Sequence, residues 1–188
     1  HALEIMDSTG GEFGFEIFTP AEALVTIWET ILAAGAAHGI LPCGLAARDS
    51  LRAGAVLPLS QQDIGDWPFI HHPWPFALAF DDDGRGFRKP FVGDRALLAA
   101  GDAPHTLAFV GRDLRKVSLP AKVADDAGRE VGDVLTCVTD MAIGRAGERI
   151  YSVASPEAPA GFKAKGLCCG FVRVAQALPA GTQLAKIP

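Results

Sequence analysis

Residues 42–66 read PCGLAARDSLRAGAVLPLSQQDIGD, and this stretch places charged side chains inside an otherwise apolar, small-residue run. A glycine opens it, the alanines and leucines that follow favour a helix, and a second glycine is a natural stop. Arg48 and Arg52 stand four residues apart, so they share one helix face, where like charges cost about 0.2–0.5 kcal/mol. The pattern indicates either an anionic or acceptor-rich ligand beside the pair, or a solvated face, or an internal ion pair with Asp49 or Glu16.

The composition is that of a globular chain with an acidic balance. The 188 residues carry a formal net charge of -5 at pH 7, so a continuous basic stripe that would neutralise a nucleic-acid backbone is lacking. No apolar run approaches the ~20 residues of a membrane-spanning helix. We therefore expect neither a nucleic-acid nor a membrane partner. A small anionic ligand stays possible, and the basic cluster of Arg112, Arg115 and Lys116 is either a solvated loop or a guide for an anionic tail.

The four cysteines, Cys43, Cys137, Cys168 and Cys169, form no CxxC pair and lack the spacing of a small disulfide-rich domain. Reduced thiols in a cytoplasmic protein are the default expectation. Neighbouring residues on a strand face opposite sides, so we expect one of Cys168 and Cys169 in the core and the other partly exposed. A redox or metal role for this pair is the minor alternative.

Two elements are expected upstream of the quoted stretch. Phe15 and Ile17 alternate with Glu16, which is typical of a strand whose Phe15 and Ile17 side chains face a core while Glu16 points away. The sequence TPAE at residues 19–22 resembles a capping box with proline at the first helical position. Apolar residues then recur at helical spacing as far as Gly35, which predicts an amphipathic helix.

A composition shift at residues 101–104 marks the predicted domain boundary, giving domains of residues 1–101 and 102–188. Just before it, residues 92–100 form a predicted short helix. Beyond it, short strand candidates are separated by turns rich in Gly and Pro, as in a small barrel or sandwich. These candidates are residues 106–110, 117–119, 130–138, 150–153, 166–174 and 183–187.

Three further features have a structural interpretation beside a functional one. Residues 67–80 (WPFIHHPWPFALAF) form a stiff apolar loop that either packs at an interface or closes over a ligand. His71 and His72 are adjacent and lack a third ligand at metal spacing, so no metal site is expected. Residues 81–86 (DDDGRG) begin like a calcium loop but carry Arg85 where a third ligand should fall, which favours a hairpin turn.

Three segments carry a resemblance to a known family. GLAARDSLR followed by LPLSQQDI, within residues 44–64, resembles the signature of the aminomethyltransferase family. GGEFGFEIF at residues 10–18 resembles its TGE-x-G-(F/Y/V)-E-I strand, and KPFVGDRAL at residues 89–97 resembles its K-x-F-(I/V)-G-x-x-A-L segment. The order and spacing are those of the family, which includes the tetrahydrofolate-dependent T-protein of the glycine cleavage system and related folate-dependent demethylases.

The resemblance implies an α+β fold, with a folate-binding domain of aminomethyltransferase type, incomplete at its N-terminus, followed by a small antiparallel β-barrel. Because the resemblance begins in mid-strand and the chain opens at His1, we expect it to be the C-terminal portion of a longer protein. The catalytic Asp of the family belongs to the upstream half. No catalytic residue is therefore assigned in this chain, which alone is expected to be inactive.

Glu16 and Arg48 are the candidate ligand-binding residues. A carboxylate matches a flat heterocycle that carries an amino group beside a ring N–H, and a guanidinium offers the complementary donors. On the residues alone, a surface strand glutamate is the plainer interpretation of Glu16. The resemblance implies that both side chains hold the pteridine end of tetrahydrofolate. Thr9 is a departure, because relatives often carry a tyrosine there that would contact the ligand.

The function that the resemblance implies is tetrahydrofolate-dependent aminomethyl or methyl transfer, with a lipoyl carrier protein as a possible partner. Two alternatives stand beside it. A folate-binding relative of the iron–sulfur maintenance branch would carry a Lys-Gly-Cys-Tyr-x-Gly-Gln-Glu motif, and this sequence has nothing like it. A non-catalytic folate-binding or interaction module that has kept the fold is the other.

Overall fold

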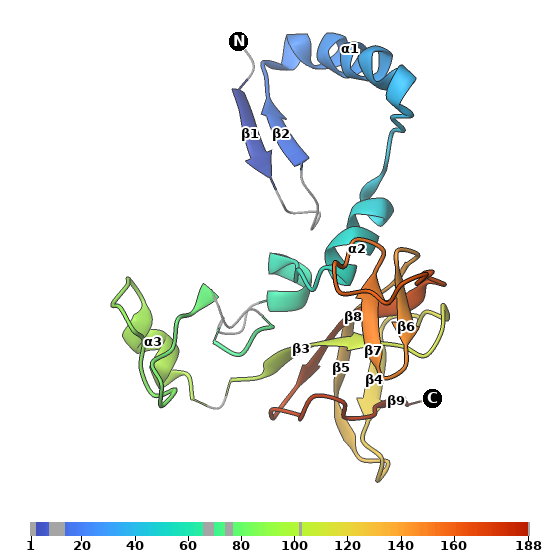
Figure 1. The fold of residues 1–188 in the computed structure, drawn as a ribbon. Helices are drawn as coiled ribbons and strands as arrows, with labels where there is room; N and C mark the ends of the chain where they lie inside the picture. The colour runs from blue at the N-terminus through green and yellow to red at the C-terminus, as the bar shows by residue number, and fades with distance from the viewer. Residues whose placement is uncertain (1–2, 8–13, 66–69, 74–76, 102, 188) are drawn as a thin grey trace. The chain divides into compact units, whose positions relative to one another are not determined.

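The computed structural model describes residues 3–7, 14–65, 70–73, 77–101 and 103–187, which form two units (Figure 1). The first unit runs over His1–Leu57 and the second over Pro58–Pro188. Helices and antiparallel strands both contribute, which confirms the expected α+β class. The predicted boundary between residues 101 and 102 falls within the second unit and stays a prediction.

The first unit consists of a β-hairpin followed by two helices, and both predicted helices are present. The predicted capping box is not formed, because the chain enters the first helix through a 3-10 turn without a side-chain cap. None of the helices that the structure describes is long and apolar enough to cross a bilayer. In chain order the elements are β1 (Leu3–Asp7), β2 (Gly14–Phe18), η1 (Ala21–Ala23), α1 (Leu24–Gly35), η2 (Ala36–His38) and α2 (Leu45–Gly54).

Apolar side chains of β2 and α1 remain open to solvent. The side chains expected to face a core on β2 are 53% exposed for Phe15 and 42% exposed for Ile17. On α1, Leu24 is 56% and Trp28 51% exposed. The prediction of a buried strand face was therefore wrong. The strand belongs to a two-stranded hairpin, and among the residues that the structure describes no further strand extends it, so the hairpin cannot cover its own apolar face.

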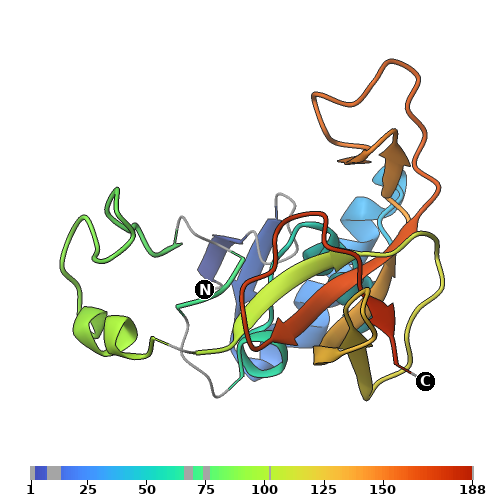
Figure 2. The ribbon, with the colours of Figure 1, turned by 90° about the horizontal axis from the view of Figure 1, so that it is seen from below.

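The second unit is organised around a five-stranded antiparallel sheet in the order β3-β8-β5-β4-β9, in which β8 lies between β3 and β5 (Figure 2). A separate hairpin, β6-β7, precedes a long connection to β8. The elements are η3 (Ser60–Ile64, a π-helical turn), α3 (Asp94–Ala99), β3 (His105–Val110), β4 (Ala121–Ala124), β5 (Glu130–Asp140), β6 (Ile143–Ala146), β7 (Arg149–Ser152), β8 (Leu167–Val174) and β9 (Ala185–Lys186).

The core of the sheet is centred on β8, in which every residue but Arg173 is buried. Its Val172 and Val174 pack with Val134 of β5, a cluster of the β-branched residues that fit a pleated, buried surface. Gly170 permits the close approach of β5, because a Cβ at this position would lie 1.8 Å from the carbonyl oxygen of Thr136. The glycine therefore accommodates the irregular register of β5 beside Thr136.

Most of the strand predictions for this unit are confirmed: residues 106–110, 130–138, 150–153 and 166–174 correspond to β3, β5, β7 and β8, and residues 183–187 contain the short strand β9. The described strands form an open sheet that ends at β3 and β9, so the predicted barrel is not confirmed. The predicted strand at residues 117–119 is not a strand, because the Val117 N–H donates to the Cys137 sulfur at 3.2 Å instead of to a neighbouring strand. The short strands β4 and β6 were not predicted.

A buried carboxylate fastens η3 to the sheet. Asp63 is fully buried, and its carboxylate accepts hydrogen bonds from the Leu59 N–H at 2.8 Å and the Thr136 hydroxyl at 2.5 Å. The Asp63 carbonyl accepts a bond from the Thr106 hydroxyl at 3.0 Å. The adjacent Gln62 side chain donates to the Thr136 oxygen at 2.9 Å. The polar-Asp-Ile part of the family signature therefore serves to dock this turn on β3 and β5.

Replacing Asp63 tests that docking role. Asp63→Ala removes the acceptor of the partly buried Leu59 N–H and of the buried Thr136 hydroxyl, so we expect the free energy of unfolding to fall by about 2–4 kcal/mol. The measurement is urea unfolding followed by circular dichroism. Asp82→Ala is the matched control, because the Asp82 side chain is 95% exposed in a surface pair with Arg88, and its unfolding midpoint should not move. Equal midpoints for both variants would contradict the role given to Asp63.

Candidate functional site

Glu16 lies in the middle of β2, directly opposite Ile5 in the hairpin register. The alternation of the strand puts its side chain on the face opposite Phe15 and Ile17, as predicted. The residue is exposed, and the carboxylate receives no hydrogen bond from any residue that the structure describes. Both carboxylate oxygens are therefore available to a ligand.

The two arginines of α2 differ in their surroundings, which separates the alternatives that the sequence left open. Arg52 is buried, and its guanidinium donates to the Asp49 carboxylate at 2.7 Å and to the Leu57 carbonyl at 3.2 Å. Arg48 is exposed, and its side chain bonds to none of the described residues. Arg52 is thus part of an internal ion pair, whereas the guanidinium donors of Arg48 remain available to a ligand.

Within the first unit, the structure gives Glu16 and Arg48 complementary chemistry without joining them. No hydrogen bond or ion pair links the two side chains among the described residues. An exposed carboxylate and an exposed guanidinium that do not satisfy each other can each bind one edge of a flat polar ligand. Thr9 lies outside the described residues, so its predicted loss of an aromatic contact stays a prediction.

The histidines of the second unit form a small cluster that the sequence did not reveal. Much of the predicted loop, residues 67–69 and 74–76, lies outside the described residues. The His71 and His105 rings stack with centroids 3.9 Å apart, and His71 Nε2 lies 3.2 Å from the Gly101 carbonyl. Burial, and then the charge of His71, lowers the pKa of His72 to about 4, and the same causes lower the pKa of His105. Among the described residues, no group of three or more His, Cys, Asp or Glu side chains is placed to hold a metal ion.

All four cysteines are free thiols, and their burial divides them. Cys43 is exposed between α1 and α2, while Cys168 and Cys169 on β8 are both buried. The prediction that one of the β8 pair would be partly exposed was wrong, because β8 is an internal strand covered on both faces. Burial raises the pKa of Cys169 to about 12, and the Asp140 carboxylate adds to that effect.

The aspartate-rich segment at residues 81–86 is a hairpin turn, as predicted. The Arg85 N–H donates to the carboxylates of Asp81 and Asp83, each at 3.0 Å, and Phe80 pairs with Phe87 across the turn. These backbone bonds lower the pKa of Asp81, after the larger effect of its side-chain bond to Asp83. The carboxylates therefore stabilise the turn itself.

Sequence reasoning missed two groups of residues. The buried role of Asp63 was hidden because its partners, Thr106 and Thr136, lie far away in the chain. The predicted basic cluster was incomplete, because Arg145 and two lysines line the same cleft as Arg112 and Arg115, whereas Lys116 does not line it. Spacing along the chain could have indicated neither group.

Comparison with known proteins supports the family resemblance seen in residues 44–64. The family model described as the GCVT N-terminal domain matches residues 8–68, which contain both Glu16 and Arg48. That match assigns the first part of the chain to the glycine-cleavage T class of domain.

Several curated aminomethyltransferases are similar over most of the chain. The aminomethyltransferase of Geobacillus thermodenitrificans is 36% identical over 134 residues, which cover 67% of this chain and 34% of the relative. That of Symbiobacterium thermophilum is 37% identical over 138 residues, covering 70% and 35%. That of Caldanaerobacter subterraneus subsp. tengcongensis is 54% identical over 111 residues, covering 58% and 28%. The chain belongs to the aminomethyltransferase family, and its matched part spans about a third of the length of these relatives.

The lowered pKa of His72 predicts a pH dependence of stability. Because the folded pKa of about 4 lies below the ordinary value of 6.5, the folded state favours the neutral ring. The stabilisation is complete above pH 6.5 and is lost as the pH falls from 6.5 toward about 4. We expect His72→Gln to flatten the fall in unfolding free energy over this range, measured by urea titrations at several pH values.

His38→Gln is the control for this experiment, because His38 is exposed in the first unit and should leave the slope unchanged. An identical pH slope for His72→Gln and the unaltered chain would show that His72 does not carry the effect.

Proposed function

We propose that this chain contributes part of the tetrahydrofolate site of an aminomethyltransferase of the glycine-cleavage T-protein type. The observation that carries the proposal is the pair of exposed side chains, Glu16 and Arg48, within the residues that match the family model. The similar proteins are named aminomethyltransferases, which supports the transfer reaction. Because the matched part covers only about a third of their length, the proposed activity needs residues beyond this chain.

The residues present fit a pterin. The Glu16 carboxylate can accept two parallel N–H bonds from an amino group and the adjacent ring nitrogen, a pairing that fixes both position and orientation. The Arg48 guanidinium supplies donors for carbonyl and nitrogen acceptors of the same ring system. Since neither side chain is engaged by another described residue, no internal bond has to be broken before the ligand binds.

Glu16 and Arg48 act in this proposal by orientation. Tetrahydrofolate, when bound, supplies the nitrogen that accepts the one-carbon unit. Holding one reactant in the correct geometry makes the transfer effectively unimolecular, which is the contribution expected of side chains that touch the ring without moving protons. The aminomethyl donor would be carried by a lipoyl protein. A cytoplasmic location belongs to the same proposal and is supported by the four free cysteines.

Tetrahydrofolate titration tests the site. We expect the longest natural protein that contains this chain to show saturable quenching of tryptophan fluorescence. Glu16→Gln and Arg48→Ala should each weaken binding by about 10- to 100-fold, because each removes a hydrogen bond with a charged partner. The readout is the dissociation constant from the fluorescence titration.

Glu22→Gln and Arg95→Ala are matched controls, because each makes the same chemical change at an exposed helical position outside the proposed site. Both controls should bind as the unaltered protein does. Binding that ignores Glu16 and Arg48 would show that the two residues were wrongly assigned. A protein that binds no folate would instead be a member of the family whose ligand site has been lost.

The chain of 188 residues is expected to show no transfer activity by itself. The proposal places the catalytic Asp outside this chain, so Glu16 and Arg48 could bind but not complete the site. Turnover by the purified chain, measured as ammonia released from an aminomethyl-lipoyl donor in the presence of tetrahydrofolate, would contradict that placement. Folate binding without turnover would agree with it.

A further inference from the structure

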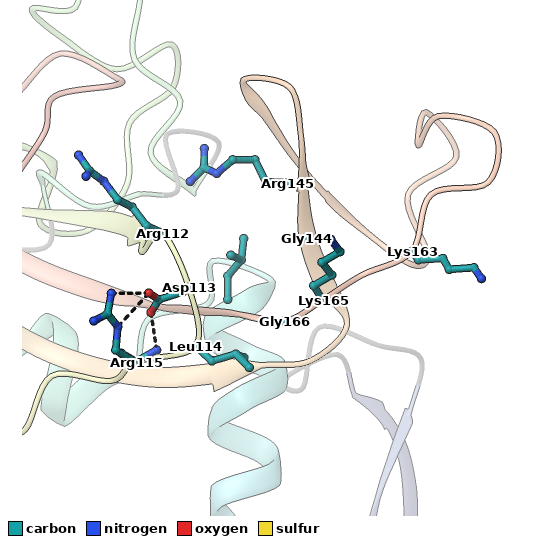
Figure 3. Close-up of a pocket in the computed structure, with 10 residues that line it drawn as sticks. Arg112, Asp113, Leu114, Arg115, Gly144, Arg145, Lys163, Lys165 and Gly166 are labelled. Carbon is teal, nitrogen blue, oxygen red and sulfur yellow. Dashed lines mark hydrogen bonds and ion pairs between the residues drawn. The ribbon is translucent and has the colours of Figure 1, made fainter.

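Charged side chains from three separate segments line a cleft of about 520 Å³ in the second unit (Figure 3). The segment after β3 contributes Arg112 and Arg115, the end of β6 contributes Arg145, and the connection into β8 contributes Lys163 and Lys165. These five cations stand in a chain whose net charge is -5, so the cleft has the opposite sign to the molecule as a whole.

Main-chain contacts hold the three segments together. The Gly111 N–H donates to the Cys168 carbonyl at 2.7 Å, and the Cys168 N–H donates to the Asp113 carbonyl at 2.7 Å. The Gly166 N–H donates to the Ile143 carbonyl at 3.0 Å, which ties the lysine segment to β6. These bonds make the cleft a preformed feature of the sheet edge.

A glycine allows the lysine segment to lie directly against β6. A Cβ at Gly144 would stand 3.1 Å from Ala164 Cα and 3.2 Å from the Lys165 nitrogen. Such contacts are tighter than ordinary van der Waals distances, so a side chain at this position would push Lys163 and Lys165 away from Arg145. The position of the lysine segment beside β6 therefore depends on Gly144.

The positive charge of the cleft is largely uncompensated. Its one carboxylate, Asp113, accepts bonds from Arg115 Nε at 2.9 Å and Nη2 at 2.6 Å, and these bonds lower the pKa of Asp113. Asp113 therefore neutralises Arg115 alone. Among the residues that the structure describes, Arg145 donates only to the Gly111 carbonyl, at 3.4 Å.

The other cations of the cleft have no anionic partner within the described part of the chain. Arg112, Lys163 and Lys165 form no ion pair with any described residue. Like charges held near one another repel, and an anionic ligand removes that repulsion.

The spacing of the cations indicates the kind of anion. Figure 3 shows Arg112, Arg145, Lys165 and Lys163 spread apart rather than aimed at one point, with the Lys163 side chain directed away from the other three. A single phosphate would need converging donors, whereas several carboxylates along a chain would meet one cation each. Leu114 and Leu167 line the same cleft and offer apolar surface for the methylene groups between carboxylates. A nucleic-acid strand would need the basic surface to continue beyond the cleft, which the acidic composition opposes.

We propose that this cleft binds an oligocarboxylate, a chain bearing several carboxylates such as an oligoglutamate. Arg112 and Arg145 hold one part of the chain, and Lys163 and Lys165 hold the part nearer the connection into β8. The cleft lies entirely in the second unit and shares no residue with the proposed pterin site, so the two proposals can fail separately.

The test uses tetraglutamate as the probe and isothermal titration calorimetry of the 188-residue chain at about 0.05 M salt. Tetraglutamate should bind measurably, and uncharged tetraglutamine should not. The double variant Arg112→Gln/Arg145→Gln should weaken binding by about tenfold, from the loss of two exposed charge contacts. Raising the salt to about 0.3 M should weaken binding to the unaltered chain.

The matched control is Arg129→Gln/Arg149→Gln, which makes the same change in net charge at exposed arginines that do not line the cleft. It should bind as the unaltered chain does. Lys163→Gln/Lys165→Gln provides a second test on the other side of the cleft if the arginine variant unfolds.

Three outcomes would overturn the proposal. One is the absence of tetraglutamate binding at low salt. Another is an equal loss of binding in the Arg129/Arg149 control, which would reveal a general charge effect. The third is tighter binding of tripolyphosphate or of a short single-stranded oligonucleotide than of tetraglutamate, which would assign the cleft to phosphates.

Discussion

The buried carboxylate of Asp63 is the interaction on which the second unit depends. It bonds to the backbone of its own turn and to the Thr136 hydroxyl of β5, while its main-chain carbonyl meets Thr106 of β3. A buried carboxylate is costly unless such donors surround it, so this turn can dock in only one way. The polar residues of the segment at 57–64 therefore have a structural purpose that is separate from any ligand.

Local sequence patterns were sufficient to predict most of the regular elements. Apolar spacing predicted α1, helix-favouring residues between two glycines predicted α2, and turns rich in Gly and Pro bounded the predicted strands β3, β5, β7 and β8. Closure of the sheet into a barrel depends on pairing between distant strands, and the described sheet stays open between β3 and β9. The exposed side chains of Phe15 and Ile17 on β2 and the buried thiol of Cys169 show the same limit, since burial is decided by neighbours that spacing does not specify.

The two candidate sites differ in how much of each could be predicted from the sequence. Glu16 and Arg48 could be singled out because they stand within segments that resemble a known family. Their neighbour Arg52 has equivalent spacing on α2, but only the structure shows that it is an internal partner of Asp49. The basic cleft joins residues of three segments between 112 and 165, so its charge becomes visible only when the β-strands bring those segments together.

The position of β8 has a consequence for biosynthesis. This strand lies inside the sheet between β3 and β5, yet its pairing partner β3 begins more than sixty residues earlier in the chain, at His105 against Leu167. As the polypeptide leaves the ribosome, β4 and β5 can pair as a local hairpin, but among the described strands β3 has no partner strand until β8 emerges. Non-local pairing of this kind is slow and leaves apolar strand surface uncovered in the meantime. The apolar surface of β3 therefore waits for its partner strand throughout the synthesis of the residues between β3 and β8.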